Sequence, residues 1–204
     1  TMIKNGIIVT MNSRMDVYPD GYLIMEDDRI SEVGPMTGYD AYRDRQGMMV
    51  IDAGHAIVMP GMVNTHCHMG MIPFRGLGDD CRDRLRVFLL PMEFKAMDRE
   101  LVRLSSRFAV CELLLSGVTT VMDMYYFEDA VAEVMDEMGI RGIAGETVME
   151  DATCDAGTPR ESIARGEELI RRYRNHPRIM GCISPHGTTT CSSSTLQKIH
   201  ELDQ

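Results

Sequence analysis

Residues 58–68 read Val58-Met59-Pro60-Gly61-Met62-Val63-Asn64-Thr65-His66-Cys67-His68, an apolar run that ends in two histidines separated by one residue. Alternate side chains of a β-strand point to the same face, so His66 and His68 share a face and Cys67 points away from it. Two imidazoles on one face at a strand end can bind the same Zn²⁺ or Fe²⁺ ion. Because this spacing also arises without function, the surrounding sequence has to decide.

The sequence pattern differs on the two sides of this motif. Before it, short branched-apolar runs separated by Gly, Asp and Pro predict strands of a small β-sandwich. After Pro60, apolar runs alternate with longer amphipathic segments, which predicts βα units and a parallel sheet. The expected strands are 3–10, 22–26, 30–34, 48–54, 57–63, 118–124, 140–145 and 179–184, and the expected helices are 83–96, 98–116, 127–138, 159–174 and 195–203.

The predicted fold class is α/β, with about four βα units that correspond to the first half of a (β/α) TIM barrel. Residues 1–57 are predicted to be the N-terminal part of a composite β-sandwich, and residues 58–204 the half barrel. An open doubly wound sheet is the alternative, although no Gly-rich phosphate-binding fingerprint follows the first strand of the βα region.

Composition excludes several classes of protein. Hydrophobic residues make up 44% of the chain and charged residues 25%, as in ordinary soluble domains. The net charge of -10 argues against nucleic acid or an anionic membrane as partner. No run approaches the roughly 20 apolar residues that span a bilayer. Six cysteines without a C-x-x-C pair, and no recognisable secretory signal, indicate free thiols and a cytoplasmic location.

The motif at residues 58–68 resembles the opening metal motif of the amidohydrolase superfamily. Residues 69–80 and 90–93 are similar to the branch that holds S-adenosylhomocysteine/methylthioadenosine deaminases and triazine hydrolases. Residues 116–125 and 184–192 match the same branch in the same order. With the N-terminal strands resembling the family's β-sandwich, the resemblance covers the whole chain.

This resemblance implies roles for four residues. His66 and His68 would be the first two ligands of one divalent metal, with Zn²⁺ the first choice and Fe²⁺ the alternative. Glu93 would hydrogen-bond the substrate ring, and His186 would contact substrate beyond the fourth strand of the barrel. Without the resemblance, Glu93 reads as an exposed helix carboxylate and His186 as a loop histidine.

Three further residues are also candidates for the site. Asp123 ends the second barrel strand and either orients a ligand histidine or caps the following turn. Glu146 ends the third, where related deaminases often carry a substrate-binding arginine, so an acidic residue there argues against nucleoside-type substrates. Arg160 either supplies a cation from the neighbouring loop or is an exposed arginine at a helix start.

The superfamily's metal site also needs a third histidine on the fifth strand, a general base after it, and an aspartate on the eighth. We expect these, including the catalytic base, downstream of Gln204. The hypothesis is therefore that the chain is the N-terminal half of a longer enzyme and is inactive alone. Its open strand edges and apolar surface predict a homo-oligomer.

The function implied is metal-dependent hydrolysis of a non-peptide carbon–nitrogen bond. The expected reaction is deamination of an aminated heterocycle, a purine, pyrimidine or adenosyl-like small molecule. Two alternatives stay open: a triazine hydrolase that releases chloride or an amine, and a catalytically incomplete fragment or pseudo-enzyme.

Overall fold

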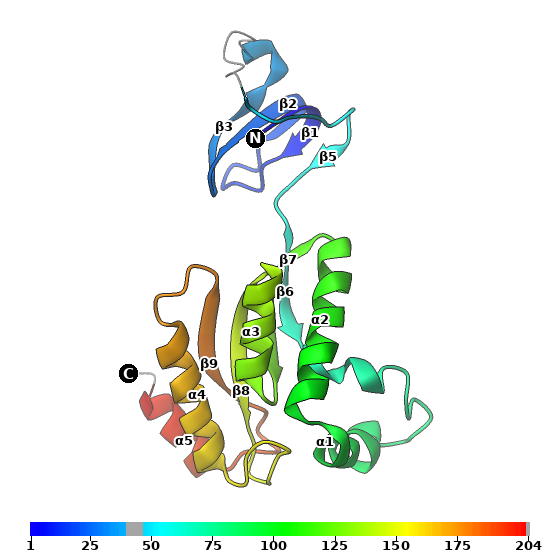
Figure 1. Cartoon of the computed structure of the whole chain (residues 1–204), viewed down its shortest axis with the longest axis vertical. Coiled ribbons are helices and arrows are strands. Elements are labelled where there is room, and N and C mark those ends of the chain that lie inside the picture. The colour runs from blue at the N-terminus through cyan, green and yellow to red at the C-terminus, as the bar shows by residue number, and fades with distance from the viewer. Residues whose placement is uncertain (40–46, 203–204) are drawn as a thin grey trace. The chain divides into compact units, whose positions relative to one another are not determined.

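The chain divides into two compact units, Thr1–Gly61 and Met62–Gln204, in a computed structural model that describes residues 1–39 and 47–202 (Figure 1). None of the described helices combines the length and apolar character needed to cross a membrane.

The first unit is built around one mixed sheet. Its elements are β1 (Met2–Val9), β2 (Val17–Glu26), β3 (Arg29–Pro35), the 3-10 turn η1 (Met36–Gly38), β4 (Val50–Asp52) and β5 (Ile57–Val58). The strand order is β3-β2-β1-β4, with β5 also pairing with β1. Met2, Tyr22 and Ile24 form its buried core. The described residues of this unit form a single sheet, so a second sandwich layer stays a prediction.

The second unit is a layer of helices on a parallel sheet. Its elements are β6 (Met62–Cys67), η3 (Met69–Phe74), η4 (Arg84–Leu89), α1 (Leu90–Ala96), α2 (Arg99–Leu115), β7 (Val118–Tyr125), α3 (Glu128–Met138), β8 (Arg141–Val148), α4 (Pro159–Tyr173), β9 (Ile179–Pro185) and α5 (Ser193–Leu202). All neighbours in the order β6-β7-β8-β9 are parallel. The predicted βα alternation is confirmed, whereas closure into a barrel stays a prediction.

The predicted strand 57–63 is wrong as a single element. Ile57–Val58 pairs with β1 in the first unit, and Met62–Cys67 pairs with β7 in the second. The break falls at Pro60, which has no N–H to donate to a sheet, and at Gly61. Consequently the first strand of the parallel sheet extends to Cys67, and His68 follows its last residue.

The segment before α1 also departs from expectation. The predicted helix 83–96 begins with a π-helical turn, η4, and becomes α-helical only at Leu90. Pro91 lacks the N–H that would bond to the carbonyl of residue 87, which explains why regular α-helical bonding starts here. The six-residue 3-10 segment η3 was not predicted. Residue 203, the predicted end of the last helix, lies outside the described residues.

Small residues let two helices approach the same face of this sheet. A Cβ atom on Gly142 of β8 would lie 2.3 Å from Sδ of Met135 in α3, and one on Gly181 of β9 would lie 2.6 Å from the backbone of α4. Gly142 and Gly181 occupy equivalent faces in the β8–β9 register. Helices α3 and α4 therefore cover one side, and side chains at the alternate positions, such as Met180, project from the other.

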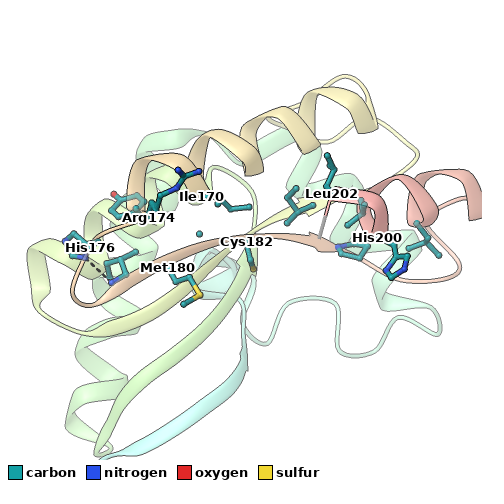
Figure 2. Close-up of a pocket in the computed structure, with 14 residues that line it drawn as sticks. Ile170, Arg174, His176, Met180, Cys182, His200 and Leu202 are labelled. Carbon is teal, nitrogen blue, oxygen red and sulfur yellow. Dashed lines mark hydrogen bonds between the residues drawn. The ribbon is translucent and has the colours of Figure 1, made fainter. Parts of the chain in front are cut away.

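That other side and the edge of β9 are open in the described part of the chain. Met180 is 61% exposed although it is apolar and lies within a strand. A groove of about 720 Å³ runs along β9 between α4 and α5, with Ile170, Cys182 and Leu202 among its lining side chains (Figure 2). This is where the predicted continuation of the barrel would pack.

Candidate metal centre

His66 and His68 converge at the carboxyl end of β6. Their Nε2 atoms lie 3.0 Å apart, and the rings meet edge to face with centroids 4.8 Å apart. Two nitrogens bound to one tetrahedral Zn²⁺ at 2.0–2.1 Å are about 3.3–3.4 Å apart. The pair thus has nearly the spacing that a shared ion requires, and its imidazole nitrogens are ligands that Zn²⁺ and Fe²⁺ accept.

A contact with the neighbouring strand β7 fixes the orientation of the His68 ring. Its Nδ1 lies 2.6 Å from the carbonyl oxygen of Met124 in β7. A carbonyl only accepts hydrogen bonds, so Nδ1 carries the proton and donates it. In the neutral ring this leaves the lone pair on Nε2, the atom that faces His66.

Within residues 1–39 and 47–202, no group of three or more His, Cys, Asp or Glu side chains could hold a metal. Among the described residues, the candidate site therefore has two candidate ligands, His66 and His68. An open depression of about 400 Å³ lies beside the pair, bordered by η3 and by Arg84.

Asp123 lies behind the histidine motif. Its side chain is fully buried, and Oδ1 accepts the backbone N–H of Met69 at 2.7 Å. Cys67 is the register partner of Asp123 between β6 and β7, and burial, together with the charge of Asp123, raises the pKa of the Cys67 thiol. Both contacts are with residues next to the histidines, which favours the orienting role over the turn-capping one.

Glu93 is buried, not exposed as an isolated helix carboxylate would be. From α1 it accepts hydrogen bonds from the hydroxyl of Tyr125 at 2.9 Å and from that of Tyr126 at 3.4 Å. Burial raises the pKa of Glu93, and the two hydroxyl donors and the nearby charge of His68 oppose that rise. Tyr125 is the last residue of β7 and Tyr126 follows it. No pattern in the sequence indicates that these two hydroxyl groups contact Glu93.

His186 follows β9 in a loop whose shape is fixed by hydrogen bonds. Its backbone N–H donates to the carbonyl of Val148 at 3.0 Å, and its Nδ1 pairs with Oγ1 of Thr190 at 2.9 Å. Burial, and secondarily the positive charge of His68, lowers the pKa of His186. The structure therefore brings Glu93 and His186 within electrostatic reach of His68 from two different elements.

Glu146 lies away from this group. Its Oε1 accepts from Nε of Arg165 at 3.2 Å, and its Cβ lies against Gly166 of α4, on the helix-covered side of the sheet. Arg160 lies in the first turn of α4 with an exposed side chain. The cation that meets Glu146 is thus Arg165, a residue that the sequence interpretation missed because only the α4 packing brings it there.

Removing the Tyr125 hydroxyl should raise the pKa of Glu93 further. The hydrogen bond from Tyr125 is the largest of the contributions that lower this pKa. Without it, in Tyr125→Phe, the upward effect of burial on the Glu93 pKa is less compensated. We expect an upward shift of about one unit, measured by ¹³C NMR titration of the Glu93 carboxyl. Tyr18→Phe, on β2 in the other unit, is the matched control and should leave the titration unchanged. An unchanged Glu93 titration in Tyr125→Phe would contradict the hydrogen bond.

Glu146 should make stability fall as pH rises. Burial, followed by the charge of Asp155 and a hydrogen bond to it, raises the pKa of Glu146 from 4.5 to about 9. The folded chain therefore binds this proton more tightly than the unfolded chain. The stabilisation is complete below pH 4.5 and is lost as pH rises through about 9.

Glu146→Gln should remove this contribution, because an amide of nearly the same size cannot ionise. The variant is expected to match the parent within about 1 kcal/mol at pH 5 and to be more stable at pH 9. Urea unfolding at both pH values measures the difference. Parallel pH profiles for the two proteins would show that Glu146 does not titrate as described.

The chain matches the amidohydrolase family over residues 57–203. This match begins just before the histidine motif and includes Glu93 and His186. The chain belongs to the amidohydrolase family. Its family match therefore covers most of the chain and all of the sheet that carries the histidine pair.

Individual proteins and solved structures are similar to this chain over nearly its whole length. A 5-methylthioadenosine/S-adenosylhomocysteine deaminase of Thermodesulfovibrio yellowstonii is 34% identical over 204 residues, which are 98% of this chain and 46% of that protein. A zinc-bound adenosine deaminase structure from Xanthomonas campestris has a TM-score of 0.85 and 27% identity, over 98% of this chain and 46% of that one. The chain thus spans about half the length of the relatives it matches.

A zinc-bound atrazine chlorohydrolase structure from Arthrobacter aurescens is also similar. Its TM-score is 0.80 and its identity 21%, over 99% of this chain and 51% of that chain. At this identity the similarity concerns the fold alone, so it is evidence for the amidohydrolase α/β architecture and not for an activity.

Proposed function

We propose that this amidohydrolase chain supplies the first two ligands of a divalent metal site that hydrolytically deaminates an aminated heterocycle. One observation carries the proposal: the Nε2 atoms of His66 and His68 lie 3.0 Å apart, while the Nδ1–H of His68 is committed to Met124. The deaminase names of the relatives at about 34% and 27% identity support the reaction class. The zinc in the similar adenosine deaminase structure supports Zn²⁺ as the metal.

The residues of this chain would divide the work as follows. His66 and His68 would hold the metal, and a bound metal would lower the pKa of a coordinated water toward roughly 7. Glu93, held by the hydroxyl groups of Tyr125 and Tyr126, would bind a polar edge of a ring substrate. His186, in the loop after β9, would contact the same substrate. Because its pKa is lowered, it would act as a neutral hydrogen-bonding partner at pH 7.

Nucleoside-type substrates are compatible with this arrangement. The acidic Glu146 argued against them only if its side chain faced the substrate. It instead pairs with Arg165 beneath α4. We therefore include adenosyl compounds with purines and pyrimidines as the proposed substrate class.

The test uses the natural protein that contains this sequence. It is loaded with Zn²⁺ and incubated with an adenosyl compound, an aminopurine, an aminopyrimidine and a chlorotriazine, and ammonia and chloride are measured. Ammonia from one of the first three supports the proposal. Chloride release instead would identify the triazine alternative. A zinc-loaded protein that releases neither product would contradict the deaminase proposal and favour a pseudo-enzyme.

A further inference from the structure

Two buried carboxyl groups meet behind the histidine pair. Asp123 lies near the carboxyl end of β7, Glu128 is the first residue of α3, and both are 0% exposed. Oδ2 of Asp123 and both carboxyl oxygens of Glu128 receive no hydrogen bond from any N–H or hydroxyl group in the described part of the chain. Buried polar atoms are rarely left in this state, so the two groups must satisfy each other.

A hydrogen shared between the two carboxyl groups satisfies Oδ2 of Asp123 and one of the two Glu128 oxygens. Two neighbouring carboxylates cannot both ionise in a buried site. Burial, followed by the charge of Asp123 and a hydrogen bond to it, raises the pKa of Glu128 well above its usual value. Glu128 thus stays protonated and donates a hydrogen bond to Asp123, which remains the acceptor for the Met69 N–H.

A strained turn places Glu128 at this point. Phe127, between β7 and α3, has a φ of 54°, in the left-handed region that a bulky residue rarely adopts. Its N–H donates to Oδ2 of Asp155 at 2.6 Å, and the guanidinium of Arg165 lies 5.8 Å from its ring centroid. The N–H of Glu128 itself donates to Glu146 at 3.3 Å. Several contacts therefore maintain a backbone shape that brings one carboxyl group against Asp123.

We propose that Glu128 is a positioning residue for the metal ligands, acting through Asp123 on Cys67 and Met69 and thereby fixing His66 and His68. The chain of contacts runs from the start of α3 to the residues that flank His68 on both sides. This inference rests on the proposed metal centre for its purpose, but the contacts themselves do not require a metal.

The test compares two variants of nearly the same side-chain size in the 204-residue chain. Glu128→Gln retains a donor to Asp123, whereas Glu128→Leu does not. Long-range ¹H–¹⁵N NMR of the metal-free chain reports the tautomer of His68, and titration with ZnCl₂ followed on the same two rings reports affinity at this pair alone. Glu137→Leu, on the exposed side of α3, is the control for changing a charge on the same helix.

We expect a single His68 tautomer, with the proton on Nδ1, in the parent, Glu128→Gln and Glu137→Leu chains. Glu128→Leu should show mixed tautomers and about tenfold weaker zinc binding, whereas Glu128→Gln should stay within about twofold. If Glu128→Leu does not fold, Glu128→Asn replaces it, since asparagine suits a helix start but is too short to reach Asp123.

Two results would overturn the proposal. One is a Glu128→Leu or Glu128→Asn chain with the parent's tautomer and affinity. The other is equal impairment in Glu128→Gln, which would assign the effect to lost charge or packing. A parent chain whose histidine rings do not respond to zinc would count against the proposed metal centre, while the tautomer comparison would still decide the role of Glu128.

Discussion

Replacing His68 with alanine should weaken zinc binding at this site at least about tenfold and leave His66 as a single ligand. The same loss is expected for His66→Ala, because the two Nε2 atoms converge on one point. In the natural protein that contains this sequence, either change should lower kcat/KM about 10³-fold. The reason is that a metal contributes several kcal/mol of transition-state stabilisation, and each 1.36 kcal/mol is a factor of ten.

Site-resolved NMR titration with zinc and steady-state ammonia release provide the two measurements. His200→Ala, on α5, is the matched control for removing a histidine and should retain both properties. If His66→Ala and His68→Ala bound zinc as tightly as His200→Ala, the pair would not be the metal centre. Retained turnover in both variants would contradict the proposed function as well.

Gly181→Ala should destabilise the second unit by about 2–3 kcal/mol, the upper range for an overpacked core. A Cβ atom at this position would lie 2.6 Å from the backbone N of Ile170 and from the carbonyl carbon of Leu169. These neighbours belong to the backbone of α4, so no side chain can rotate away. The helix or the strand must shift, and β9, which precedes His186, shifts with it.

Urea unfolding followed by far-UV circular dichroism measures the change. Gly187→Ala serves as the control, because its added Cβ would meet only Oγ1 of Thr190, at 3.8 Å. That variant should stay within about 0.5 kcal/mol of the parent. Equal free energies of unfolding for the two variants would show that α4 can move away from β9 without destabilising the unit.

The order of elements in the second unit could be predicted because each signal was local. Apolar runs and Gly punctuation located β7, β8 and β9 within a few residues. The errors arose where a proline acts on backbone hydrogen bonding. Pro60 divides a continuous apolar run between two sheets, and Pro91 separates a π-helical turn from an α-helix.

The candidate site was predictable only in part. The His-x-His spacing at a strand end predicts two side chains on one face, although His68 itself follows the last residue of β6 and its ring is held by the Met124 carbonyl. The surroundings of Glu93 and Glu146 were not predictable, because tertiary packing determines which face they occupy. Tyr125, Glu128 and Arg165 acquire their partners from other elements, and no spacing rule relates such pairs.

The buried thiol of Cys67 can report how often the end of β6 opens. Its thiol lies between the two histidines in sequence but faces the opposite side, against Asp123, and burial raises its pKa to about 12. A thiol reagent at pH 8 therefore meets almost no thiolate until this strand end opens. The alkylation rate of Cys67 can be compared with the rates of the exposed Cys111 and of the unfolded chain. The ratio of these rates gives the free energy of local opening at this strand end.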